Sequence, residues 1–132
     1  MDLTTALIWF GLITVVVLTL DIWFTYLTKG FGYGFSSNRS GGERTGLGLR
    51  LQRSLQNQME SAAYVVPALG AGIFLGLDGQ GVQIAALLIV LGRAAFLPLY
   101  WTGVPFIRVP AFAVAILGSV YILVVALLNA GA

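Results

Sequence analysis

The sequence has no cysteine, no histidine and few charged residues. Without cysteine there is no disulfide, no thiolate nucleophile and no cysteine-ligated metal. Without histidine the chain lacks the usual general base near neutral pH and the commonest metal ligand. The five acidic residues are scattered, so we expect no metal site. Charged residues make up 9 % of the chain, against about 25 % in an average soluble domain.

Apolar residues make up 58 % of the 132 residues, which is too many for an ordinary soluble domain of this length. The same composition excludes a disordered tail, because disordered segments are poor in apolar residues. The seven basic residues are few and lie beside apolar runs, so nucleic-acid binding has no support. The length suits a single membrane domain.

Long uncharged runs divide the chain into four segments that each approach the roughly 20 apolar residues needed to cross a bilayer. We therefore predict an all-α integral membrane protein built as a four-helix bundle. The helices are expected near residues 4–28, 48–77, 81–101 and 105–129. The glycine- and serine-rich stretch 29–47 is expected to be a loop, either a flexible tether or a lid over a site.

Basic residues gather at one end of the predicted bundle. Three of them lie in the 29–47 loop, two more follow it directly, and Arg108 lies beside the third connection, whereas the second connection carries Asp78. Cytoplasmic loops of membrane proteins carry an excess of lysine and arginine. We therefore expect a multi-pass protein of a bacterial inner membrane, with the 29–47 loop in the cytoplasm.

Polar residues share one face of the second helix. Relative to Arg50, the offsets of Arg53, Asn57 and Glu60 place all four within a stripe about 80° wide. A charge at membrane depth costs at least about 2.5–3.5 kcal/mol, so it needs a partner. We expect Glu60, the deepest of the four, to pair with Arg93 of the third helix.

The third helix has a stripe of its own, with Arg93, Phe96 and Tyr100 at positions i, i+3 and i+7, and Arg108 follows it. Arginines then outnumber acids at this end of the bundle. A surplus of guanidinium groups in a partly dry place suits a carboxylate, a phosphate or a thiolate. The alternative is that the charges only neutralise one another and fix the helix register.

Two spaced patterns combine these residues: Arg53-x-x-x-Asn57-x-x-Glu60, and Arg93-x-x-Phe96-x-x-x-Tyr100 followed by Gly103 and Arg108. Together they resemble the signature of the MAPEG family, the membrane-associated proteins in eicosanoid and glutathione metabolism. Chain length, the four expected spans and the grouping of charges also match that family. The resemblance therefore covers the whole chain.

The resemblance implies a homotrimer in which glutathione, as co-substrate, lies between adjacent protomers at the cytoplasmic end. It implies that Glu60 binds the γ-glutamyl amine and that Arg108 stabilises the thiolate, with Tyr100 beside it. The full set of expected site residues is Arg50, Arg53, Asn57, Glu60 and Arg93 for glutathione binding, with Tyr100 and Arg108 in catalysis.

Three functions follow as hypotheses. The first is a glutathione-dependent membrane transferase or peroxidase acting on apolar electrophiles or lipid hydroperoxides; a cation lowers the pKa of a thiol from about 8.5, so the chain needs no cysteine of its own. The second is a non-catalytic accessory subunit of a larger membrane complex, since Phe96 stands where catalytic members often carry tyrosine. The third, and the least favoured, is a small proton-coupled transporter that uses Glu60.

Overall fold

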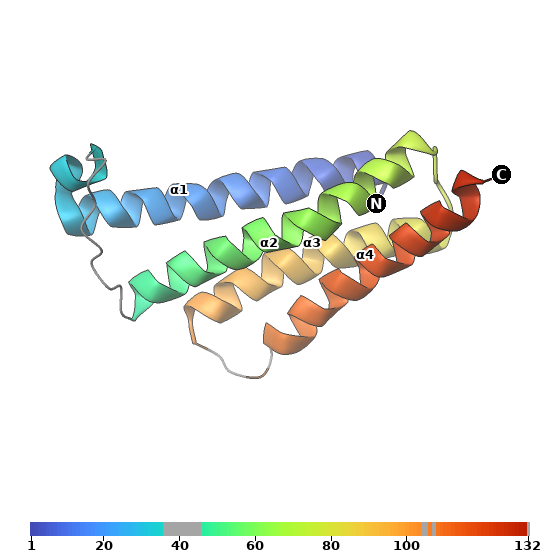
Figure 1. Ribbon diagram of the computed structural model, residues 1–132. Coiled ribbons are helices and arrows are strands. Elements are labelled where there is room, and N and C mark those ends of the chain that lie inside the picture. Colours follow the sequence, from blue (N-terminus) through green and yellow to red (C-terminus); the bar gives the residue numbers. More distant parts are fainter. Residues whose placement is uncertain (36–45, 104–105, 107, 132) are drawn as a thin grey trace.

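Four helices make up the part of the chain that the computed structural model describes, which is residues 1–35, 46–103, 106 and 108–131. They form one elongated bundle (Figure 1). The predicted all-α four-helix bundle is thereby confirmed. The helices are α1 (Leu3–Phe35), α2 (Leu47–Phe74), α3 (Gln80–Trp101) and α4 (Arg108–Ala130).

Helix α1 continues to Phe35, past the expected end at residue 28. Gly30 interrupts the regular helix with φ 82°, a conformation that glycine adopts without steric cost. The segment after it turns away from the main axis of α1 (Figure 1). Residues 36–45 of the expected 29–47 loop lie outside the described residues.

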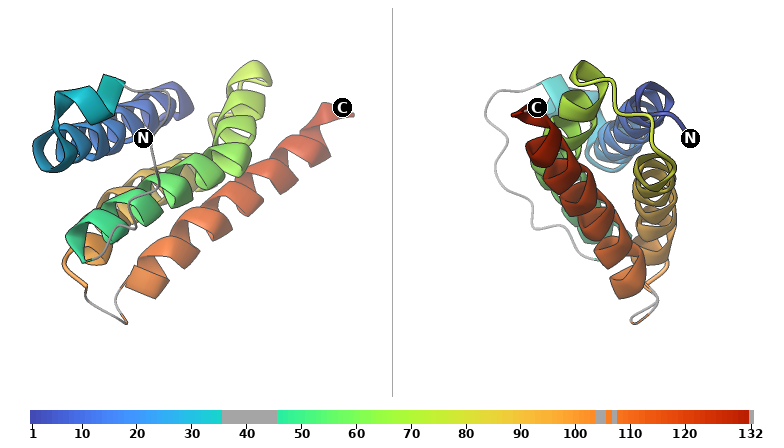
Figure 2. Two further views of the ribbon diagram at one scale, coloured as in Figure 1. Left: turned by 60° about the vertical axis from the view of Figure 1, so that its left-hand side comes forward. Right: turned by 90° about the vertical axis from the view of Figure 1, so that its right-hand side faces the viewer.

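Helix α2 bends near Pro67, which lacks the N–H that would continue the backbone ladder. The left view of Figure 2 shows this bend in the yellow-green half of α2. The helix ends at Phe74, before the expected residue 77, because Gly76 takes φ 67° and Leu77 N donates to Gly72 O over 2.9 Å. That bond closes a Schellman-type turn.

Helices α3 and α4 approach each other closely because glycines line their contact. A Cβ added at Gly92 would lie 2.7 Å from Ala111 O, and one at Gly118 would lie 2.9 Å from Ala85 O. Helices α2 and α3 each contact all three other helices. They therefore form the centre of the bundle, with α1 and α4 on either side.

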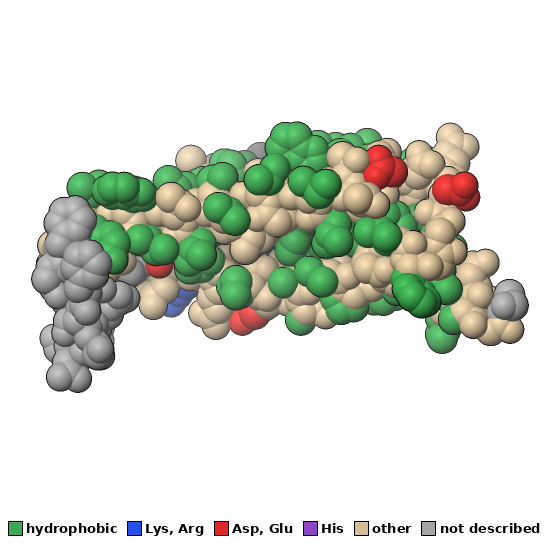
Figure 3. Space-filling view, turned by 90° about the horizontal axis from the view of Figure 1, so that it is seen from above, with side chains coloured by type: hydrophobic (Ala, Val, Ile, Leu, Met, Phe, Trp, Pro, Cys, Tyr) green, Lys and Arg blue, Asp and Glu red, His purple; other side chains and the backbone are tan. Residues whose placement is uncertain are grey.

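The exterior is apolar along most of its length. Leu27, Leu117 and Leu127 are exposed, and Figure 3 shows hydrophobic side chains spread from one end of a face to the other. The span of α1 from Leu3 to Thr28, together with α3 and α4, is long and apolar enough to cross a membrane. The first half of α2 is more polar than the other helices, and its status as a fourth span stays a prediction.

We predict that Gly92→Ala destabilises the protein. The added methyl group meets backbone atoms, which cannot move aside as a flexible side chain could, so the cost should be about 1–3 kcal/mol. The measurement is the thermal unfolding midpoint in detergent. Gly70→Ala is the matched control: its Cβ meets no described atom within 4 Å, and alanine favours a helix. Equal midpoints for the two variants contradict the close packing of α3 on α4.

Candidate functional site

Three helices meet at one end of the bundle and bring the predicted arginines together. The start of α2, the end of α3 and the start of α4 enclose a depression of about 360 Å³. We call it the basic pocket. None of the described residues that line it is acidic. They are Gly46, Leu49, Arg50, Arg53, Tyr100, Gly103 and Arg108.

The end of α3 holds the arginines in place. Arg50 Nη1 donates to Trp101 O over 3.0 Å, one of the carbonyls that a helix leaves free at its C-terminus. A cation is also favoured there by the helix dipole. The Arg108 guanidinium lies over the Tyr100 ring, 4.8 Å from its centroid, which is a cation–π contact. The partners in these two contacts are therefore a backbone carbonyl and an aromatic ring, and neither is a carboxylate.

The Trp101 indole fastens the same corner to α2. Its Nε1 donates to Ser54 Oγ over 2.7 Å, and the Ser54 hydroxyl donates to Leu51 O over 2.8 Å. Ser54 is fully buried. These two hydrogen bonds hold the end of α3 against α2. They therefore also fix the position of the Trp101 carbonyl, which accepts the hydrogen bond from Arg50.

Arg93 lies much deeper and is completely buried. Its Nε donates to Gln58 Oε1 over 2.9 Å, and its guanidinium lies 4.8 Å from the centroid of the Phe96 ring. Gln58 Nε2 donates in turn to Thr14 Oγ1 over 2.9 Å, and Thr14 donates to Phe10 O. This buried polar chain joins α3 to α2 and α2 to α1.

The expected pairing of Glu60 with Arg93 is wrong in this structure. Glu60 is exposed and accepts a hydrogen bond from Gln56 Nε2 over 3.2 Å. Gln58 takes the place beside Arg93, because it lies about 200° around α2 from Glu60 and faces the interior. Among the described residues, neither Nη1 nor Nη2 of Arg93 has a hydrogen-bond partner.

Two other buried polar atoms of α2 are also without partners among the described residues: Asn57 Oδ1 and Tyr64 Oη. Tyr64 is close enough to Arg93 and Glu60 to interact with both electrostatically. Sequence analysis missed Tyr64, although it continues the α2 stripe four residues beyond Glu60. It also missed Gln58, which carries no charge and lies off that stripe.

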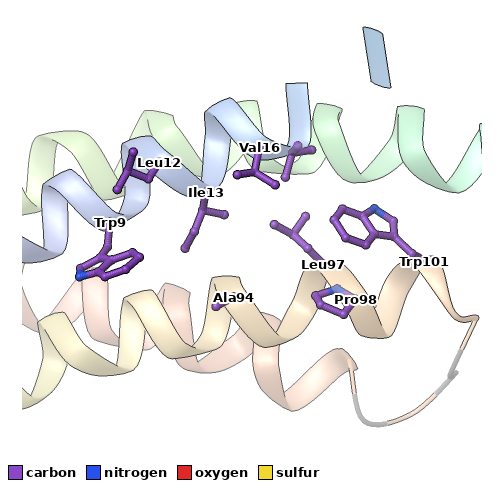
Figure 4. Close-up of a pocket in the computed structure, with 9 residues that line it drawn as sticks. Trp9, Leu12, Ile13, Val16, Ala94, Leu97, Pro98 and Trp101 are labelled. Atoms are coloured by element: carbon purple, nitrogen blue, oxygen red, sulfur yellow. The ribbon is translucent and has the colours of Figure 1, made fainter. Parts of the chain in front are cut away.

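An apolar groove of about 250 Å³ runs between α1 and α3. Figure 4 shows side chains of both helices pointing into it, among them Trp9 and Val16 from α1 and Leu97 from α3. Trp101 lines its end. The same residue therefore contributes its ring to the groove and its carbonyl to Arg50 of the basic pocket.

The described residues bring together no group of three His, Cys, Asp or Glu side chains that could hold a metal ion. The structure thus gathers Arg50, Arg53, Tyr100 and Arg108 in one pocket. It places Asn57 and Glu60 further along α2, and Arg93 in the interior.

Comparison with known proteins gives one match. The family model of the MAPEG family matches residues 6–128, nearly the whole chain. No curated protein matches the chain, and no solved structure matches it.

We predict that Ser54 and Trp101 stabilise the fold as one unit. Ser54→Ala and Trp101→Phe should each lower the free energy of unfolding by about 1 kcal/mol, because each removes one side of the same hydrogen bond. The double variant should cost less than the sum. Trp9→Phe, at a half-exposed indole on α1, should change little. Strictly additive effects in a denaturation series contradict the bond.

Proposed function

Because the chain belongs to the MAPEG family, we propose that this membrane protein binds glutathione and activates its thiol. As a transferase, the thiolate forms a C–S bond to an apolar electrophile and displaces its leaving group. As a peroxidase, it attacks the O–O bond of a lipid hydroperoxide, which releases the alcohol and leaves a sulfenic acid that a second glutathione converts to the disulfide and water. One observation carries the proposal. Three arginines line one pocket with no acid among its described lining residues. A fourth, Arg93, is buried, and neither of its Nη atoms has a hydrogen-bond partner in the part of the chain that the structure describes.

Charge complementarity supports this assignment. Glutathione carries two carboxylates and one ammonium group, and guanidinium groups bind carboxylates through paired, charge-assisted hydrogen bonds. Arg50 and Arg53 in the basic pocket suit the carboxylates. Glu60 is exposed and accepts a hydrogen bond from the neutral amide of Gln56, so its charge suits the γ-glutamyl ammonium. Asn57 and Arg93 supply further polar atoms that lack partners among the described residues.

Arg108 and Tyr100 are proposed to act on the thiol. A cation near sulfur lowers the thiol pKa and raises the fraction of thiolate at neutral pH. The Arg108 guanidinium already rests on the Tyr100 ring, so its position is fixed before the ligand arrives. The protein would then supply positioning and electrostatic stabilisation, while the sulfur of glutathione supplies the nucleophile.

The polar face of α2 supports a homotrimer. Arg53, Gln56 and Glu60 are exposed on the single chain, although polar side chains at membrane depth normally face protein or a water-filled cavity. Partner copies packed on this face would shield it from lipid. A site between protomers would then be closed on one side by the neighbouring chain.

A non-catalytic accessory subunit is the second candidate, and Phe96 is the observation that favours it. Its ring packs on Arg93, Tyr100 and Phe112, with centroids 5.6 Å from Tyr100 and 5.7 Å from Phe112. Phenylalanine offers no hydroxyl to a thiolate. In that case the fold would bind glutathione, or a partner protein of a larger complex, without turnover.

We predict that the purified protein binds glutathione in detergent and that Arg53→Ala and Glu60→Ala each weaken binding about tenfold or more, because each removes a charged contact. Calorimetry gives the affinity. Gln52→Ala, at an exposed position of α2 outside the basic pocket, is the control and should bind as the unmodified protein does.

Ultraviolet difference absorbance of bound glutathione separates the two candidates. A thiolate band that disappears in Arg108→Ala supports the transferase or peroxidase. Binding without a thiolate band supports the accessory subunit. Absence of binding rejects a glutathione-based function altogether.

A further inference from the structure

The direction of the hydrogen bonds around Gln58 is fixed by chemistry. An arginine side chain can only donate, so the atom that faces Arg93 Nε at 2.9 Å must be the amide oxygen. The amide nitrogen then faces Thr14 Oγ1, also at 2.9 Å. Thr14 donates onward to Phe10 O over 2.9 Å. The Gln58 amide is therefore held on one side by α1 and holds Arg93 on the other.

This anchoring fixes how the guanidinium points. The group is planar and rigid, so a bond at Nε and a ring contact with Phe96 determine the plane in which both Nη atoms lie. Those two nitrogens are buried and have no partner among the described residues. Asn57 Oδ1 and Tyr64 Oη are likewise buried without a hydrogen-bond partner among the described residues. Arg93 is thus held in a fixed orientation inside the bundle, with two donors that no described residue satisfies.

The neutral side chain at position 58 also keeps the Arg93 charge uncompensated. A glutamate would have nearly the same shape, would accept the same bond from Arg93 Nε and would cancel the buried charge. It could not donate to Thr14 Oγ1 as the Gln58 amide does. A lone buried charge is costly, and an acidic partner reduces that cost. Compensation of the Arg93 charge alone would favour glutamate at position 58, whereas the bond to Thr14 requires the amide nitrogen of glutamine.

We propose that Gln58 is a positioning residue, which aims the Arg93 guanidinium and leaves its charge available to an anionic group of the ligand. The inference rests on the proposed function, because that ligand is glutathione. Gln58 would contact neither glutathione nor its sulfur and would act only through Arg93.

The test compares Gln58→Glu with the unmodified protein in detergent. We expect the thermal midpoint to change little, because the counter-ion gained by the buried charge offsets the lost donation to Thr14. The affinity for glutathione should fall about tenfold or more. A residue with only a structural role would move both quantities in the same direction. Gln58→Leu should lower both, since it leaves Arg93 Nε and Thr14 without the amide.

Gln52→Glu is the matched control, because it adds the same charge to an exposed position of the same helix. Its affinity for glutathione should stay within about twofold of the unmodified protein at moderate salt. If both variants weaken binding equally, the effect is one of net charge and the inference is wrong.

The outcomes separate the two proposals. Binding by the unmodified protein and equal binding by Gln58→Glu overturn the role of Gln58 and leave the proposed function standing. Failure of the unmodified protein to bind overturns the proposed function, and the role of Gln58 with it. If Gln58→Glu does not yield folded protein, Thr14→Val decides: it releases the amide from α1, and unchanged affinity overturns the inference.

Discussion

Arg93 is charged and completely buried, and accommodating that charge is the constraint on which the interior of this bundle depends. Its Nε donates a hydrogen bond to the amide oxygen of Gln58, and the amide nitrogen of Gln58 donates to Thr14 of α1. A hydrogen bond is stronger in a medium of low dielectric, so these few contacts weigh more than they would at a surface. They also cross three helices. Any shift of α1, α2 or α3 along its axis breaks one of them.

Among the four helices, the polar residues are concentrated on α2, which explains why its composition differs from that of the other three. Its first turns contribute Arg50 and Arg53 to the basic pocket, its middle carries Asn57 and Glu60, and its inner face carries Gln58. Helices α1, α3 and α4 provide the apolar length that a membrane requires. Helices α3 and α4 also contribute Tyr100 and Arg108 to the basic pocket at their ends, so α2 supplies most, but not all, of its polar side chains.

The fold could be predicted because twelve charges among 132 residues leave uncharged runs whose lengths suit membrane helices. The basic pocket could be predicted for a related reason: Arg50, Tyr100 and Arg108 lie at helix ends, and helix ends of a bundle meet. The extension of α1 to Phe35 could not, since a glycine-rich stretch indicates a loop and gives no sign that Gly30 only interrupts the helix.

The partner of Arg93 could not be predicted from periodicity. A helical stripe shows which residues of α2 share a face, but it does not show which face turns toward α3. Opposite charge favoured Glu60, whereas packing turned the Gln58 side of α2 inward. Tyr64 could not be predicted either, because it is uncharged and lies one turn beyond Glu60, the last charged residue of the stripe.

Trp101 belongs to two environments at once, the apolar groove and the basic pocket. Its ring borders the groove between α1 and α3, while its carbonyl restrains an arginine on the opposite side of the helix end. A bulky hydrocarbon that pushed the indole aside would break its bond to Ser54 and move that carbonyl. In that case, filling of the apolar groove and the arrangement of the basic pocket would be thermodynamically linked, because each would change the free energy of the other.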